Sequence, residues 1–155
     1  MQAKDIMTTD VVIVSANETV AKVVNLFVQK NVTYAVIVDD NNNIQGIITD
    51  GDIMTAIRQR RPVYVDLFNS VFILQDNFDL ASKINALAKT PVKDIATRKV
   101  YSVTEEATVT EIAGLMADKK IKQVPITRDG CLVGLVRRHD IINAVAKTPH
   151  IEGRI

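Results

Sequence analysis

Cysteine, histidine and tryptophan are scarce in this 155-residue chain, and their scarcity excludes several kinds of site. Cys131 is the only cysteine, so an intrachain disulfide is excluded and one chain cannot build a cage of several thiolates around a metal. The two histidines, His139 and His150, stand in no metal-binding spacing with carboxylates or with Cys131. A phosphate-binding P-loop and a dinucleotide-binding glycine motif are also missing. The sequence therefore favours a protein that is not an enzyme, with no catalytic residues, no metal and no obligatory cofactor.

The chain also lacks an excess of charge and long apolar runs. Lysine and arginine number 19 against 18 aspartates and glutamates, so electrostatics give no general reason to expect nucleic acid or an anionic membrane as a partner. Polar residues interrupt every apolar run well before about 18 residues, and the start of the chain has no signal-peptide pattern. We therefore expect a cytoplasmic protein.

The main positive feature is an internal repeat. A shift of 89 residues aligns Asp5-Ile6 with Asp94-Ile95, and also Thr8 with Thr97. After the turns the shift becomes 88, which aligns Gly46 with Gly134 and Asp52 with Asp140. One residue fewer in the second turn explains this change. The chain therefore contains the same unit twice.

Each copy predicts the same elements in the same order, β-α-β-β-α. A short apolar strand at residues 11–14 or 100–103 precedes an amphipathic helix that Thr19 or Thr108 can cap, and Glu111 completes a capping-box pattern. Two strands then flank a polar turn, as a hairpin requires. A second helix starts near residue 51 or 139 and runs to about residue 60 or 146. Apolar stripes along the helices predict core packing.

These boundaries give residues 1–61 as the first repeat, 62–93 as an insert and 94–148 as the second repeat, followed by a tail at 149–155. The insert predicts extended segments and a helix at residues 78–87, and it is too apolar for a solvated tether. We expect it to pack on the sheets or to help the protein dimerise. Within the tail, residues 151–154 read Ile-Glu-Gly-Arg and resemble a protease-recognition remnant, with a natural tail as the alternative.

The order Asp-Ile-Met-Thr, strand, helix, hairpin and Gly-Ile-Ile-Thr-Asp-Gly-Asp-Ile resembles the CBS domain over about 120 of the 155 residues. The resemblance implies an α+β fold in which two CBS repeats are related by a pseudo-twofold axis. It also implies a ligand signature of glycine, two apolar residues, threonine or serine, two variable residues and aspartate. Residues 46–52 of the first copy keep this signature in full, with Ile48 among its apolar positions, and Thr49 and Asp52 as candidate ligand contacts.

The chemistry of Thr49 and Asp52 suits a nucleotide. A carboxylate can accept hydrogen bonds from both vicinal hydroxyls of a ribose, and free amides at a helix start favour phosphate. The alternative is that Asp52 only caps its helix. The second copy keeps Asp140 but has Arg137 in place of the threonine, so Arg137 either meets a phosphate or fills the pocket. The sequence therefore supports one ligand site more firmly than two.

By resemblance, a bound nucleotide also touches the segment that leads into the hairpin of the other copy. In the second copy this segment contains Lys122, Gln123 and Val124, and Lys122 aligns with residues that contact phosphates in some relatives. In the first copy Tyr34 either stacks on a base or belongs to the core.

We therefore expect a regulatory module that binds an adenine nucleotide (AMP, ADP or ATP), forms a homodimer and signals to a separate effector protein. Two alternatives stay open at this point. One is a structural dimerisation or protein-interaction module with a vestigial pocket. The other is a sensor of S-adenosylmethionine or of a cyclic dinucleotide.

Overall fold

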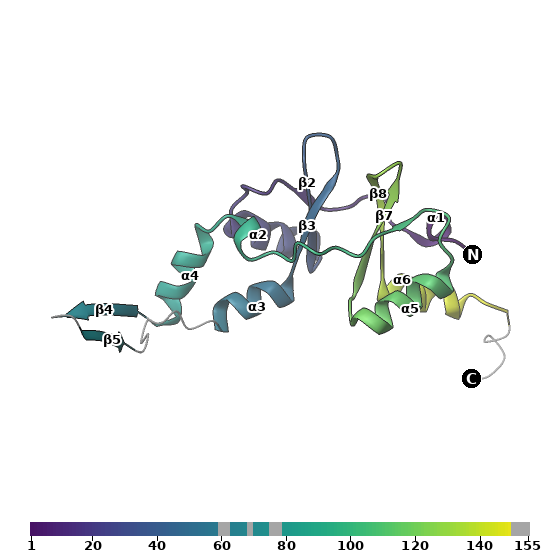
Figure 1. Cartoon of the computed structure of the whole chain (residues 1–155). Coiled ribbons are helices and arrows are strands. Elements are labelled where there is room, and N and C mark those ends of the chain that lie inside the picture. The colour runs from purple at the N-terminus through teal and green to yellow at the C-terminus, as the bar shows by residue number, and fades with distance from the viewer. Residues whose placement is uncertain (59–62, 68–69, 75–78, 150–155) are drawn as a thin grey trace.

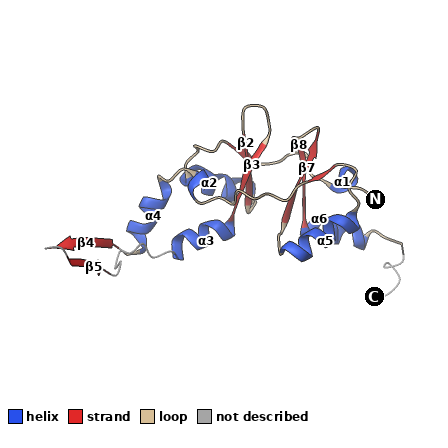
Figure 2. Ribbon diagram, in the orientation of Figure 1, coloured by secondary structure: helices blue, strands red, loops and turns tan. Residues whose placement is uncertain are grey.

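The computed structural model describes residues 1–58, 63–67, 70–74 and 79–149. The predicted tail from residue 150 onward, including His150, and the predicted ends of the first repeat at residues 59–61 and of the insert helix at residue 78 lie outside these residues. Figure 1 shows two sheets side by side in the middle of the molecule. Figure 2 shows helices α3, α5 and α6 along one side of them, where α3 spans Asp50–Arg58, α5 Val109–Lys119 and α6 Arg138–Ala146.

The first repeat folds as β-α-β-β-α behind a short leading helix. Its elements are α1 (Ala3–Ile6), β1 (Ile13–Val14), α2 (Val20–Lys30), β2 (Tyr34–Val38), β3 (Ile44–Thr49) and α3 (Asp50–Arg58). Strands β2 and β3 form an antiparallel hairpin, and β1 pairs with β2 in parallel. Strand β1 is shorter than the predicted span of residues 11–14, because only Ile13 and Val14 are in register with β2.

The second repeat has the same order. Its elements are η1 (Val92–Asp94), β6 (Val103–Thr104), α5 (Val109–Lys119), β7 (Gln123–Arg128), β8 (Cys131–Arg137) and α6 (Arg138–Ala146). The strand order β6-β7-β8 matches β1-β2-β3. Both hairpins also carry a register shift at the equivalent place, between Ile37 and Val38 and between Ile126 and Thr127. The predicted duplicated α+β fold is confirmed.

The long helix of each repeat begins and ends in the same way. Thr19 accepts a hydrogen bond from the amide of Lys22, and Thr108 forms a capping box with Glu111, as the sequence predicts. Both helices then stop at a left-handed residue, Asn31 in the first repeat and Lys120 in the second. This stop turns the chain directly into β2 or β7.

The segments before β1 and β6, which we call the leading segments (residues 2–8 and 91–97), cross over to the other repeat. The amide and carbonyl of Thr8 bond those of Leu135 on β8 at 3.0 Å, and Thr97 bonds Ile47 on β3 in the same way. These are equivalent positions under the repeat alignment. The two repeats are thus joined by two equivalent pairs of backbone hydrogen bonds.

The crossing also places side chains from each leading segment in the core of the opposite repeat. Val92 is fully buried in the core of the first repeat, and Ala3 is fully buried in the core of the second. Each core thus contains residues from the leading segment of the other repeat. The two halves therefore depend on each other for stability.

The insert contains a hairpin and a helix. Strands β4 (Val63–Leu67) and β5 (Ser70–Leu74) pair with each other, and α4 (Leu80–Ala88) packs against α2 and α3. The predicted extended segments and helix are therefore present. The expectation that the insert packs on the sheets is wrong for the hairpin, because Figure 1 shows the hairpin at the far end of the molecule, beyond α3 and α4.

The crossed packing makes a stability prediction. Val92→Ala should lower the free energy of unfolding by about 1.5 to 3 kcal/mol, since it removes buried methyl groups from the core of the opposite repeat. Val28 on α2 is 78% exposed, so Val28→Ala is the matched control and should change little. Urea denaturation measures both variants. Equal small effects would show that η1 adds nothing to the first core.

Candidate functional site

A cleft of about 430 Å³ opens between the two repeats. Three pieces of chain line it: the end of β3 with the start of α3, the leading segment of the second repeat with the residues after it, and the turn from α5 into β7. The lining residues are Ile47, Thr49, Asp50, Gly51, Thr97, Lys99, Val100, Tyr101, Lys119, Lys120, Ile121, Lys122 and Gln123. A molecule in this cleft would touch both repeats.

Asp52 is not itself a lining residue, but it accepts hydrogen bonds from two residues that line the cleft, Thr49 and Thr97. One carboxylate oxygen, Oδ2, accepts the backbone amide of Thr49 at 2.9 Å and the Thr49 hydroxyl at 3.3 Å. The other, Oδ1, accepts the hydroxyl of Thr97 at 3.1 Å. Asp52 therefore does cap the start of α3, and it also reaches the leading segment of the second repeat. Hydroxyl groups can turn away from an acceptor, so Oδ1 is open to exchange with a ligand hydroxyl.

The lining of the cleft is strongly cationic. Four of its lining residues are lysines, Lys99, Lys119, Lys120 and Lys122, against one lining carboxylate, Asp50. The ammonium groups of Lys99 and Lys119 lie 5.5 and 5.2 Å from the centre of the Tyr101 ring, within range of a cation–π interaction. The ring thus holds two positive charges near each other at the cleft.

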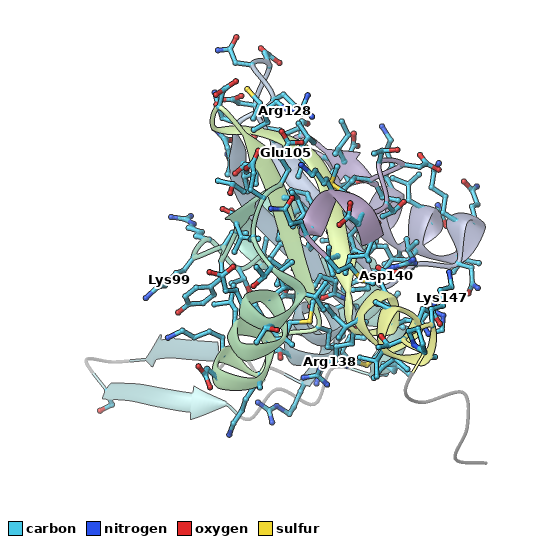
Figure 3. The ribbon with its side chains drawn as sticks, turned by 90° about the vertical axis from the view of Figure 1, so that its right-hand side faces the viewer. Lys99, Glu105, Arg128, Arg138, Asp140 and Lys147 are labelled. Atoms are coloured by element: carbon cyan, nitrogen blue, oxygen red, sulfur yellow. The ribbon has the colours of Figure 1, made fainter. Side chains whose placement is uncertain are left out.

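The equivalent place in the second copy is arranged differently. The backbone amide of Arg137 donates to Oδ2 of Asp140 at 2.8 Å, just as Thr49 does to Asp52. The Arg137 side chain then donates to both oxygens, from Nε at 3.0 Å and from Nη2 at 2.9 Å. This ion pair raises the pKa of Arg137, chiefly through the hydrogen bond to Asp140. Figure 3 shows Asp140 and the cleft residue Lys99 on opposite sides of the view.

The predicted site residues fall into three groups. Thr49, Lys122 and Gln123 line the cleft, and Asp52 bonds two of its lining residues. Ile48 and Val124 are fully buried behind it, in the cores. Arg137, Asp140 and Tyr34 do not line this cleft, and Arg137 and Asp140 are the second copy's counterparts of Thr49 and Asp52.

Tyr34 is a core residue in the structure. It is only 2% exposed, and its ring packs in the core of the first repeat. Burial raises the pKa of its phenol above the ordinary value. The structure thus favours the core alternative for Tyr34 over stacking on a base.

Sequence reasoning missed several lining residues, above all Thr97, Lys99 and Tyr101. They reach the cleft because the chain crosses between repeats, which no local motif shows. The alignment of Thr8 with Thr97 was the one available signal.

Other kinds of site find no support in the part of the chain that the structure describes. No cluster there has three or more histidine, cysteine, aspartate or glutamate side chains placed to hold a metal ion. No helix in those residues is long and apolar enough to cross a membrane.

Comparison with known proteins settles the family. The family model of the CBS domain matches residues 3–59 and 92–147. The chain belongs to the CBS domain family. It is a tandem CBS pair, the arrangement also called a Bateman module, and both matched stretches begin at the leading segments that cross between the repeats.

Several known proteins resemble the chain over most of its length. An uncharacterized protein of Methanocaldococcus jannaschii is 31% identical over 155 residues, covering 94% of this chain and 91% of the relative. The CBS domain pair of protein MJ0100, solved with 5′-methylthioadenosine and S-adenosyl-L-methionine, has a TM-score of 0.71 at 23% identity, covering 94% of this chain and 99% of that one. CBSX2 solved with AMP has the same score and identity, covering 94% and 96%. A protein of that name from Arabidopsis thaliana is 26% identical over 138 residues, which cover 85% of this chain and 57% of the relative. The solved structures support the fold of the pair.

Proposed function

We propose that this CBS pair is a cytoplasmic regulatory module that binds one adenosine nucleotide in the cleft between its repeats. One observation carries the proposal. The Asp52 carboxylate accepts hydrogen bonds from Thr49 and Thr97, and these two residues line a cleft that four lysines also line. A carboxylate suits the vicinal hydroxyls of a ribose, and ammonium groups suit phosphates.

The ribose end of the ligand would bind at Asp52. A ribose hydroxyl takes the place of the Thr97 hydroxyl on Oδ1, which replaces one charge-assisted hydrogen bond by another at little net cost. Thr97 is then free to bond the ligand itself. The solved complexes of CBS pairs with AMP, 5′-methylthioadenosine and S-adenosyl-L-methionine support an adenosine moiety as the common element.

The lysines favour a nucleotide over S-adenosylmethionine. The sulfonium group of S-adenosylmethionine is a cation, and four lysines around the cleft repel it. The phosphates of a nucleotide are attracted by the same positive charges. Since S-adenosylmethionine is bound in one of the similar structures, it is the second candidate, and a cyclic dinucleotide is a third because it also carries phosphates.

The regulatory signal would arise because one bound ligand bridges the two repeats. Thr49 and Asp52 belong to the first repeat, whereas Lys122 and Gln123 belong to the second, so one ligand contacts both. A ligand that binds one arrangement of the repeats more tightly than others shifts the population toward it. We propose that a separate effector protein recognises that arrangement. A vestigial pocket in a purely structural module is the alternative, and it predicts no binding.

The module would act as a homodimer. Met54 on α3 and Ile142 on α6 are equivalent residues of the two repeats, and each is 64% exposed. Figure 2 shows both helices on the same side of the sheets. A duplicated apolar patch of this kind fits an isologous interface with a second copy of the chain.

The first prediction from this proposal concerns the two aspartates. Asp52→Ala should weaken ATP binding at least tenfold, because loss of a charge-assisted hydrogen bond is worth about 1.5 to 3 kcal/mol. Asp140→Ala is the matched control and should leave the affinity nearly unchanged, since Asp140 is already paired with Arg137. Titration calorimetry measures both. The reverse order of effects would show that the ligand binds on the other side of the module.

The lysines predict a dependence on phosphate. ATP should bind more tightly than AMP, and AMP more tightly than adenosine. Lys119→Gln should weaken ATP binding by about two- to fivefold, the range expected for one exposed charge pair, without changing adenosine binding. Lys30→Gln, at the equivalent position of the first repeat, is the control. If S-adenosylmethionine bound more tightly than ATP, the second candidate would replace the first.

The dimer predicts a sedimenting species of twice 17.1 kDa at micromolar concentration. Ile142→Asp should shift it toward the monomer, since a charge would be buried in an apolar interface. Ile13→Asp, at an exposed apolar residue on a strand, should not. A monomer in the unsubstituted protein would contradict the proposal.

A further inference from the structure

We propose that the place around Asp140 in the second copy is a latent nucleoside site that Arg137 occupies, so that the chain binds one ligand where its repeat symmetry would allow two. The inference rests on the proposed function, because it assumes that Asp52 marks a nucleoside site in the first copy. It concerns the copy that the proposed function leaves out.

The two aspartates are held by the same backbone contact but have different side-chain partners. Each accepts a backbone amide from the residue three positions before it, at 2.9 Å in the first copy and 2.8 Å in the second. The carboxylate oxygens are therefore placed alike on α3 and α6. What differs is the second partner of Oδ1, a Thr97 hydroxyl for Asp52 and the Arg137 guanidinium for Asp140.

A ribose can displace the hydroxyl but not the guanidinium. The Thr97 hydroxyl is neutral, rotates freely and can bond the incoming ligand in turn. The Arg137 guanidinium is always charged and bonds both oxygens of Asp140 with the fork geometry that fits a carboxylate best. Displacing it would separate two opposite charges, and the Asp140 side chain is only 12% exposed, so water would compensate poorly. The Arg137 side chain thus occupies the position beside Asp140 that a ribose would take.

The ligand class of the latent site follows from the positions equivalent to the lysines. Lys99, Lys120 and Lys122 of the first cleft correspond to Asp10, Asn31 and Thr33 under the repeat alignment. Only Lys119 keeps a cationic counterpart, Lys30. Arg138 stands in place of Asp50, so the place around Asp140 has Lys30 and Arg138 against Asp10, where the first cleft has four lysines against Asp50. If opened, it would take the nucleoside part of the ligand with a smaller advantage for added phosphates than the first site has.

The test is the binding stoichiometry of Arg137→Thr, which restores the threonine of the first copy. Calorimetry with adenosine should give one site per chain for the unsubstituted protein and two for Arg137→Thr, the second with a dissociation constant within about tenfold of the first. The added site should gain less affinity from ATP over adenosine than the first site gains. Adding Asp140→Ala to Arg137→Thr should return the count to one. Arg128→Thr is the matched control, because it breaks another arginine–carboxylate pair, with Glu105, far from Asp140 in Figure 3.

Each outcome bears on the inference. Two sites in the unsubstituted protein, or one site in a folded Arg137→Thr, would overturn it. If circular dichroism shows that Arg137→Thr does not fold, Arg137→Gln tests the same point, since it keeps the stem and removes the charge. No binding to the unsubstituted protein with one site in Arg137→Thr would refute the proposed function and the count of one ligand per chain, and would leave only the claim that Arg137 blocks a nucleoside site at Asp140. No binding to either protein would refute both.

Discussion

The structure depends on the backbone hydrogen bonds between the leading segments and the opposite hairpins. Thr8 bonds Leu135 and Thr97 bonds Ile47, each through a reciprocal pair of hydrogen bonds at 3.0 Å. Without these hydrogen bonds each core would lose a buried residue of the opposite leading segment, Ala3 in one case and Val92 in the other. The same crossing brings Thr97 to Asp52 and places Lys99 and Tyr101 at the cleft. Stability and site therefore come from the same crossing of the chain.

The duplication gives two equivalent places, but their side chains have diverged. Thr49 and Thr97 surround Asp52 with neutral hydroxyls, whereas Arg137 neutralises Asp140 with a charge. A site that must release and rebind a metabolite needs partners that exchange easily, as hydroxyls do. A bidentate ion pair instead stabilises one arrangement. The first place is thus suited to sensing and the second to holding the structure together.

Much of this fold could be predicted because its signals are local. The capping residues Thr19 and Thr108 and the motif around Thr49 each lie within a few residues of sequence, and each recurs or has a counterpart in the second copy. What could not be predicted depends on distant packing. Burial of Tyr34 was one of two alternatives, because a strand pattern does not tell which environment a face meets. The position of the insert was missed for the same reason, since apolar composition indicates packing but names no partner.

Hydrogen exchange with and without ATP tests the central claim, a single nucleotide site between the repeats, most directly. ATP should slow exchange at residues 47–52, 97–101 and 119–123, which line or flank the cleft. The equivalent segments 8–12 and 30–34 should exchange at the same rate with and without ATP, which makes them an internal control. Protection of both sets would contradict a single site. Protection of neither set, at ATP concentrations up to several millimolar, would contradict nucleotide binding itself.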